Sequence, residues 1–188
     1  MNAAPAIFTI GYGARDLDAF LALLRAHEIA FLIDVRSAPY SRFKPEFARK
    51  ALENALHGAG IRYVYMGNVL GGQPDDRSCY DAAGKVLYDR VQETAAYRQG
   101  IDRVRKAFDQ GLRVALMCSE GKPELCHRSK LIGETLARLG LPVQHIDEND
   151  ALESQEAVRD RLTAGQLSLW DDYGFTSRKR YNEEAEDA

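Results

Sequence analysis

Two cysteines, a histidine and an arginine fall within one short segment of the chain, at Cys118 and at Cys126-His127-Arg128. Thiol and imidazole groups serve as nucleophiles, proton carriers and metal ligands, and arginine binds carboxylates and phosphates. An apolar run, residues 114–117, leads into Cys118, and leucine or isoleucine recurs at helical spacing after Arg128. The segment 114–140 therefore predicts a strand, a polar loop and a helix, with the reactive side chains where the strand ends and the helix begins.

Arg128 is the first candidate for an anion-binding residue. The first N–H groups of a helix have no partner within the helix, so they can hold an anion at the carboxyl edge of a sheet. On a helical wheel Arg128 lies on the same side as Leu131 and Ile132, and helical side chains lean toward the helix N-terminus. This geometry predicts that its guanidinium reaches over the loop and the end of the strand. The alternative is a structural ion pair with a buried carboxylate such as Asp34.

The two loop cysteines predict a thiol site. Cys126 falls in the predicted first turn of the helix, near Arg128, where the helix dipole and the neighbouring cation favour a thiolate. Cys118 is close enough along the chain to act as a resolving thiol. The alternative for both residues is packing, because a free cysteine also serves as a small buried hydrophobe.

Metal binding is another interpretation of the loop, with Cys118, Glu120, Cys126 and His127 as chemically suitable ligands. Two observations count against it. The chain lacks the paired C-x-x-C motifs of common structural zinc sites, and in a regular helix the neighbours Cys126 and His127 would diverge by about 100°. A metal is therefore kept as an alternative and is not favoured.

Two further loops are predicted to meet the cysteine loop. A short apolar strand, residues 6–10, ends in Gly11-Tyr12-Gly13, and a second, residues 31–33, ends in Asp34-Val35-Arg36. If the strands are parallel, their carboxyl ends share one edge with the strand that ends at Cys118. In that arrangement Arg36 binds an anion, and Asp34 positions the arginines or moves a proton.

Strand-like and helical patterns alternate along the chain. Apolar periodicity predicts helices near residues 17–24, 46–56, 101–108 and 151–162, further strands at 61–65 and 143–146, and a flexible loop at 67–72. Such alternation predicts a single three-layer α/β/α domain with a central, mainly parallel sheet. The predicted organisation is a flexible N-terminus at 1–5, the α/β domain at 6–165 and a partly disordered C-terminal extension at 166–188.

The composition is that of an ordinary globular protein, with 188 residues, 45% of them hydrophobic and 28% charged. A formal charge of -3 argues against a protein whose whole surface binds nucleic acid. The first residues lack a secretory signal, and no apolar run approaches the roughly 20 residues of a membrane helix, which predicts a cytoplasmic protein. Three cysteines predict no disulfide framework.

One segment of the chain is locally basic. Between residues 36 and 50, aromatic residues alternate with positively charged ones, a pattern that can hold phosphate and stack a base. Nucleic acid is therefore a candidate partner. The positive residues of the segment are Arg36, Arg42, Lys44, Arg49 and Lys50.

Several motifs together resemble a known family. The loop from Cys118 to Arg128 reads C-x-E-x-x-P-x-x-C-H-R, and the segment from Asp34 to Ser41 reads D-V-R-x-x-P-x-S; Thr9-Ile10-Gly11 and Leu70-Gly71-Gly72 accompany them. This combination resembles, over residues 7–145, the bacterial and archaeal family of uncharacterised proteins called domain of unknown function 488. That family usually has His-Ser after Thr-Ile-Gly, whereas this chain has Tyr12-Gly13, so a role of that pair does not carry over. The resemblance implies the fold and the choice of site, and it implies no established reaction.

The predicted function is that of an enzyme or ligand-binding protein acting on a phosphorylated, nucleotide-like or nucleic-acid-derived anion. The alternatives are a non-catalytic nucleic-acid or regulatory binding module, and a redox or metal sensor. The catalytic candidates are Cys126, Cys118, Asp34, Glu120 and His127, and the anion-binding candidates are Arg128, Arg36, Ser41 and Tyr12.

Overall fold

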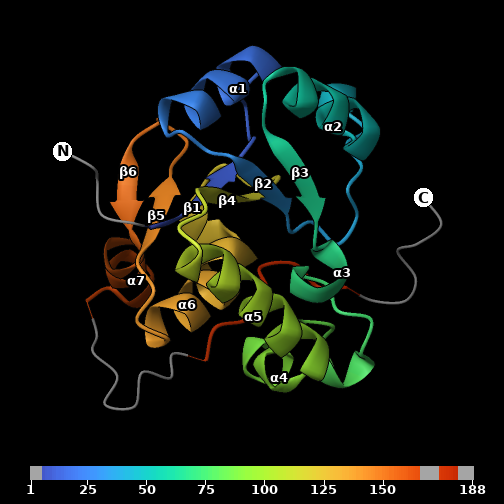
Figure 1. Ribbon diagram of the computed structural model, residues 1–188. Coiled ribbons are helices and arrows are strands. Elements are labelled where there is room, and N and C mark those ends of the chain that lie inside the picture. The colour runs from blue at the N-terminus through green and yellow to red at the C-terminus, as the bar shows by residue number, and fades with distance from the viewer. Residues whose placement is uncertain (1–5, 166–173, 182–188) are drawn as a thin grey trace.

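A computed structural model describes residues 6–165 and 174–181, and its central feature is a six-stranded sheet (Figure 1). The strand order is β3-β2-β4-β1-β5-β6. Strands β1 to β5 pair in parallel, and β6 runs antiparallel along the edge formed by β5. The mainly parallel sheet confirms the predicted fold class.

The elements alternate along the chain as the periodicity predicts. The strands are β1 (Ile7–Gly11), β2 (Phe31–Asp34), β3 (Arg62–Tyr65), β4 (Val114–Cys118), β5 (Val143–Ile146) and β6 (Leu152–Ser154). The α-helices are α1 (Leu17–Ala26), α2 (Arg49–Gly58), α3 (Gly67–Leu70), α4 (Tyr88–Glu93), α5 (Ala95–Asp109), α6 (Glu134–Arg138) and α7 (Gln155–Thr163). Short turns of other helical types are η1 (Pro45–Phe47), η2 (Arg77–Cys79), η3 (Pro123–Leu125) and the π-helical η4 (Arg128–Gly133). Across the part of the chain that the structure describes, none of the helices has the length and apolar composition needed to cross a membrane.

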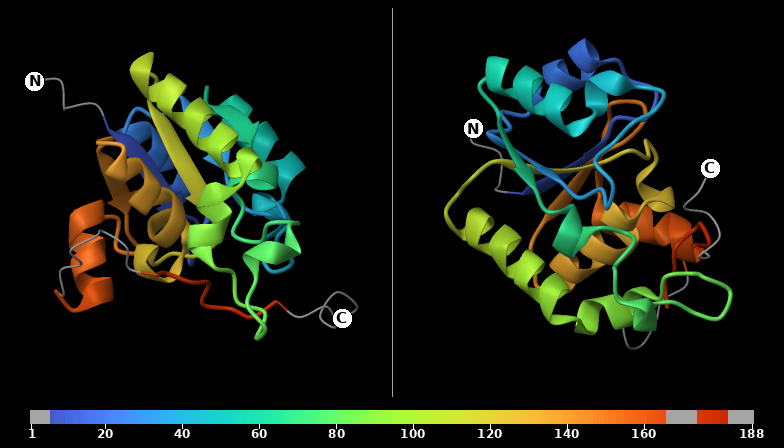
Figure 2. Two further views of the ribbon diagram at one scale, coloured as in Figure 1. Left: turned by 90° about the horizontal axis from the view of Figure 1, so that it is seen from below. Right: turned by 90° about the vertical axis from the view of Figure 1, so that its right-hand side faces the viewer.

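Helices cover both faces of the sheet, and each face has its own apolar core (Figure 2). On one face, Leu24 of α1 and Leu56 of α2 pack in the same cluster as Ile10 of β1. On the other face, Val104 of α5 packs in the same cluster as Leu116 of β4. Because successive residues of a strand point to opposite faces, and both faces are covered, these strands read as continuous apolar runs.

The chain changes direction at the two adjacent central strands, β1 and β4. From β1 it passes through α1 on one face to β2, and from β4 it passes through η4 and α6 on the other face to β5. Such a change leaves a crevice at the carboxyl ends of the two strands. In the sheet register Gly11 pairs with Cys118, and Asp34 pairs with Met117, so the three following loops begin at the same edge.

Two predicted elements were wrong. The segment 67–72 is not a flexible loop, because it contains α3, which packs on α5 at a point where a Cβ on Gly100 would lie 2.7 Å from Leu70 Cδ2. The predicted helix at 151–162 begins instead as strand β6 and becomes helical at Gln155. Elements of three or four residues carry too few side chains for periodicity to reveal them.

A buried polar chain joins β1, β5 and α7. Thr9 Oγ1 lies 2.6 Å from His145 Nδ1, and His145 Nε2 lies 2.7 Å from Gln155 Oε1. Gln155 Nε2 in turn donates to Glu134, which pairs with Arg159 at 3.0 Å. Burial lowers the pKa of His145 to about 3, so its ring stays neutral at neutral pH.

The neutral state of His145 makes stability depend on pH. Its pKa is about 3 in the folded protein against 6.5 when unfolded, so the unfolded chain binds more protons between these values. This contribution is complete above pH 6.5 and is lost as the pH falls toward 3. Between pH 7.5 and pH 5, His145 should lower the free energy of unfolding of the wild type by about 2 kcal/mol. We expect this decrease to be absent in His145→Gln. Urea unfolding measures it, with His57→Gln at an exposed histidine as control; equal pH dependence in wild type and His145→Gln would contradict the prediction.

Candidate functional site

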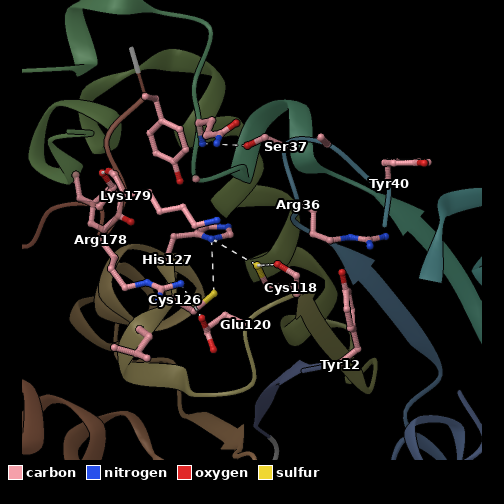
Figure 3. Close-up of a pocket in the computed structure, with 18 residues that line it drawn as sticks. Tyr12, Arg36, Ser37, Tyr40, Cys118, Glu120, Cys126, His127, Arg178 and Lys179 are labelled. Carbon is pink, nitrogen blue, oxygen red and sulfur yellow. Dashed lines mark hydrogen bonds and ion pairs between the residues drawn. The ribbon is translucent and has the colours of Figure 1, made fainter. Parts of the chain in front are cut away.

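A cleft of about 250 Å³ opens at the carboxyl edge of the sheet (Figure 3). The three loops that were predicted to converge supply its walls: Tyr12 follows β1, Arg36 follows β2, and Cys118 ends β4. The segment 177–181, from the far end of the chain, forms a further wall. The cleft therefore lies where the change of chain direction at β1 and β4 places a crevice.

Cys118, Cys126 and His127 form the reactive group of the cleft. Their sulfur atoms and one ring nitrogen all lie within 4.8 Å of one another. His127 Nδ1 is 3.8 Å from Cys118 Sγ and 3.7 Å from Cys126 Sγ. The structure thus brings three of the predicted catalytic residues into one contact group.

Cys126 lies just before the helix, and not in its first turn as predicted. Its backbone is extended, with φ −117° and ψ 148°, and helical geometry begins at His127, with φ −63° and ψ −21°. The divergence of about 100° expected for neighbours in a regular helix therefore does not apply to this pair. Both side chains can point at one place, as Figure 3 shows.

The ring of His127 is oriented by the loop after β2. Its Nε2 lies 3.1 Å from the carbonyl oxygen of Val35. A carbonyl oxygen only accepts hydrogen bonds, so Nε2 carries the proton, and in the neutral ring the lone pair of Nδ1 faces the two sulfur atoms. Gly72 lies against the same ring, and a Cβ there would be 3.0 Å from His127 Cγ.

Cys118 is the more acidic of the two cleft thiols. A hydrogen bond from the Cys126 thiol, aided by His127 and by the backbone N–H of Glu120, lowers the pKa of Cys118 well below that of an ordinary thiol. Burial, together with the neighbouring Cys118, raises the pKa of Cys126. The two sulfurs titrate as a coupled pair, and the hydrogen bond from Cys126 favours the thiolate of Cys118. This direction differs from the sequence-based expectation that Cys126 is the activated thiol, because the side-chain donors converge on the other sulfur; which thiol reacts stays a prediction.

Arg36 and Asp34 form a buried ion pair at the end of β2. Arg36 donates from Nε and Nη2 to the two carboxylate oxygens of Asp34, at 2.9 and 2.6 Å, and Tyr63 donates its hydroxyl to the same carboxylate at 2.7 Å. Burial alone would lower the pKa of Arg36, but the hydrogen bonds and the charge of Asp34 outweigh it and raise that pKa. The carboxylate thus holds the guanidinium at the wall of the cleft.

Arg128 is buried behind the cysteine loop and is not among the described residues that line the cleft. Its Nη1 donates to the carbonyl of Glu120, and its Nη2 donates to the carbonyl of Gly121, both at 2.7 Å. The guanidinium reaches the loop as predicted, where its Nη1 and Nη2 hold loop carbonyls and its Nε has no partner among the described residues. The alternative ion pair with Asp34 does not form, because that carboxylate is taken by Arg36.

Close packing of the loop on β1 depends on the absence of a side chain at Gly11. A Cβ at this position would overlap the Glu120 carbonyl and Nη1 of Arg128. The glycine of the Thr9-Ile10-Gly11 motif therefore makes room for the hydrogen bonds of Arg128.

Three other predicted site residues have distinct placements. Glu120 lines the cleft, but its carboxylate pairs with Arg178 at 2.9 Å and lies outside the sulfur and imidazole group. Ser41 accepts a hydrogen bond from the backbone N–H of Lys44 and is not among the described lining residues. Tyr12 lines the cleft, with the guanidinium carbon of Arg36 at 5.6 Å from its ring centroid.

The basic segment 36–50 is exposed in part. Phe43 is 91% exposed and Tyr40 is 70% exposed, whereas Arg36 is buried. Lys44 donates from Nζ to the carbonyl of Arg15, which ties it to the domain. Nucleic-acid binding by this segment stays a prediction.

The family model described as Domain of unknown function DUF488 matches residues 16–134. The chain belongs to the DUF488 family. The match contains the loop after β2, Gly71-Gly72 and the whole cysteine loop, and it confirms the resemblance that the motifs indicate. No curated protein and no solved structure gives a significant match to the chain.

Two parts of the cleft lie outside the DUF488 match. Tyr12 precedes it, and the segment 177–181 follows it. That segment is tied to the domain by hydrogen bonds from Ser177 N to Val86 O at 3.0 Å and from Val86 N to Ser177 Oγ at 2.9 Å. It fell within the predicted C-terminal extension, and its one sequence signal is the basic run 178–180. The rest of that extension, at 166–173 and 182–188, and the predicted N-terminus at 1–5 lie outside the described residues.

Proposed function

We propose that this DUF488 protein is an enzyme acting on a phosphorylated, nucleotide-like anion, with Cys118 as nucleophile and Arg36 as anion-binding group. The observation that carries the proposal is an unused nitrogen of Arg36 in the same cleft as Cys118. Arg36 is 4% exposed, and within the described part of the chain its Nη1 has no hydrogen-bond partner. A buried donor without a partner costs free energy, and an anion in the cleft supplies the missing acceptor.

Asp34 acts as the positioning residue for this nitrogen. Its two carboxylate oxygens take Nε and Nη2 of Arg36, which leaves Nη1 for a ligand. Further positive charge comes from Lys179, which lines the same cleft, whereas Arg178 beside it pairs with Glu120 (Figure 3). Cys118 lines this cleft too, so an anion held by Arg36 shares the cleft with the nucleophile.

The covalent step needs a base beside the thiol, and His127 supplies it. Attack of Cys118 on the phosphorus atom forms an S–P bond and breaks the bond between phosphorus and the leaving oxygen. His127 Nδ1, which holds the proton that Cys118 loses when its thiolate forms, passes that proton to the leaving oxygen. A water molecule then breaks the S–P bond, releases phosphate and restores the thiol.

The test measures protection of Cys118 from iodoacetamide by inorganic phosphate, adenosine monophosphate and a single-stranded oligonucleotide, read by mass spectrometry. Arg36→Lys keeps a positive charge beside Asp34 but removes Nη1. Because a hydrogen bond to a charged group contributes roughly 1.5–3 kcal/mol, we expect the Kd of the protecting anion to rise at least about tenfold. Arg42→Lys, at an exposed arginine, is the matched control.

Two outcomes would count against the proposal. Absence of protection by all three anions, or equal protection of wild type and Arg36→Lys, would remove Arg36 as the anion-binding group. Protection by the oligonucleotide only, with a steep salt dependence lessened by Arg42→Ala and Lys44→Ala, would favour a nucleic-acid binding module. Turnover of a chromogenic phosphomonoester that is lost in Cys118→Ser and kept in Cys79→Ser would support catalysis by the cleft thiol.

A further inference from the structure

Two cysteine sulfurs and one histidine nitrogen, all possible metal ligands, lie close together in the cleft. They belong to residues at the two ends of one loop. Cys118 ends β4, Cys126 is the extended residue before the helix, and His127 begins the helix. Their ligand atoms lie within 4.8 Å of one another (Figure 3). Thiolate and imidazole are the ligands that zinc and related cations prefer in proteins.

The separations match those of a shared cation. A tetrahedral ion with bonds of about 2.3 Å to sulfur and about 2.0 Å to nitrogen places a sulfur and a nitrogen roughly 3.5 Å apart. The structure has His127 Nδ1 at 3.8 Å from Cys118 Sγ and at 3.7 Å from Cys126 Sγ. Small side-chain movements therefore suffice to bind an ion.

The second nitrogen of His127 is held as it is in metal-binding histidines. These residues usually donate their other ring N–H to a backbone carbonyl or a carboxylate, which fixes the tautomer and the ring orientation. His127 Nε2 has this partner in the carbonyl of Val35, at 3.1 Å. The lone pair of Nδ1 is thereby directed at the two sulfurs.

The surrounding charge suits two thiolates. Arg128 is fully buried behind the loop and interacts electrostatically with both Cys118 and Cys126. Its guanidinium bonds to loop carbonyls and not to a carboxylate. A divalent ion with two thiolate ligands is neutral, and the arginine adds positive charge that favours deprotonation of the ligands.

We infer that Cys118, Cys126 and His127 bind one thiophilic divalent cation of the zinc class, with its fourth position open to the cleft. A set of three protein ligands with one open position differs from the closed four-ligand set of structural zinc sites. The cation takes the sulfur electron pair that would attack a substrate and the Nδ1 lone pair that would accept a proton. Binding therefore switches off the thiol chemistry; this last consequence rests on the proposed function, whereas the binding site does not.

The experiment titrates the reduced, chelator-treated full-length protein with Co²⁺ and then with Zn²⁺. We expect one equivalent of Co²⁺ to give thiolate-to-cobalt charge-transfer absorption and the strong visible bands of a tetrahedral ion, and Zn²⁺ to displace it. Cys118→Ser, Cys126→Ser and His127→Gln should each weaken binding by more than the roughly 10–100-fold loss typical of an outer-shell partner. Cys79→Ser, at a buried cysteine of the core, is the matched control and should bind as wild type does.

The outcomes separate this inference from the proposed function. The metal site is overturned if the wild type gives no charge-transfer band. It is also overturned if the band persists in Cys126→Ser and that variant has the circular dichroism spectrum of the wild type. If the wild type binds no metal but its Cys118 is alkylated by iodoacetamide and protected by anions, the proposed function stands without the metal. If cobalt binds but Cys118 of the metal-free protein reacts no faster than Cys79, the metal site stands and the thiol enzyme does not. Protection of Cys118 by Zn²⁺, reversed by a chelator, supports both.

Discussion

Iodoacetamide is expected to alkylate Cys118 about tenfold faster than Cys126 or Cys79 at pH 6.5, in reduced protein from which metal has been removed. The reason is the lowered pKa of Cys118, which receives a hydrogen bond from Cys126 and lies beside His127. Because a lowered pKa keeps the thiolate present below the usual value of about 8.5, the rate of Cys118 should begin to fall at a lower pH than the rates of Cys126 and Cys79. The rate falls only when the pH drops through the folded pKa. Mass spectrometry at each cysteine measures the three rates together.

The same measurement on His127→Asn separates the imidazole from the other causes. Without Nδ1 the pKa of Cys118 should rise, so its rate at pH 6.5 should fall about tenfold and recover near pH 9. His57→Asn, at an exposed histidine, should leave the profile unchanged. Faster labelling of Cys126 than of Cys118 would instead restore the interpretation from sequence that the residue beside the helix is the activated thiol.

Replacing the buried guanidinium in Arg128→Met is expected to lower the free energy of unfolding by about 3 kcal/mol. The substitution leaves the carbonyls of Glu120 and Gly121 without the donors that now lie 2.7 Å away, and each buried unpaired acceptor costs about 1–3 kcal/mol. Removal of a buried positive charge offsets part of this cost. Urea unfolding monitored by circular dichroism measures the difference.

The matched control is Arg42→Met, at an exposed arginine, which should change stability by less than about 0.5 kcal/mol. The experiment also decides between two roles for Arg128. A loss of stability with intact anion protection of Cys118 agrees with a residue that holds the loop. Wild-type stability with lost anion protection would show that Arg128 binds the anion, as its place at the helix start predicts from sequence.

These experiments concern a site in which few charged groups are free to act. Asp34 is used by Arg36 and Tyr63, and Glu120 is used by Arg178. Among the described lining residues, the groups left for chemistry include the two sulfurs, Nδ1 of His127 and Nη1 of Arg36. Thiol chemistry and cation binding draw on the same sulfur and nitrogen atoms, which is why metal content must be controlled in every assay of activity.

The fold class and the sheet edge that carries the candidate site could both be predicted from local patterns in the chain. Apolar runs that alternate with helical spacing require a parallel sheet covered on both faces, and parallel strands bring their following loops to one edge. Tyr12, Arg36 and Cys118 lie at that edge as predicted. This inference depends on strand direction and order along the chain, which local patterns reveal.

The contacts that each side chain makes at this edge could not be predicted from local patterns. The direction of a side chain depends on the backbone angles of single residues, and the extended conformation of Cys126 turns its sulfur toward Cys118 and His127. The lowered pKa of Cys118 and the hydrogen bonds of the Arg128 guanidinium both depend on partners that the folded loop supplies. The contribution of segment 177–181 depends on pairing with residues near Val86, about ninety positions earlier, which no local periodicity encodes.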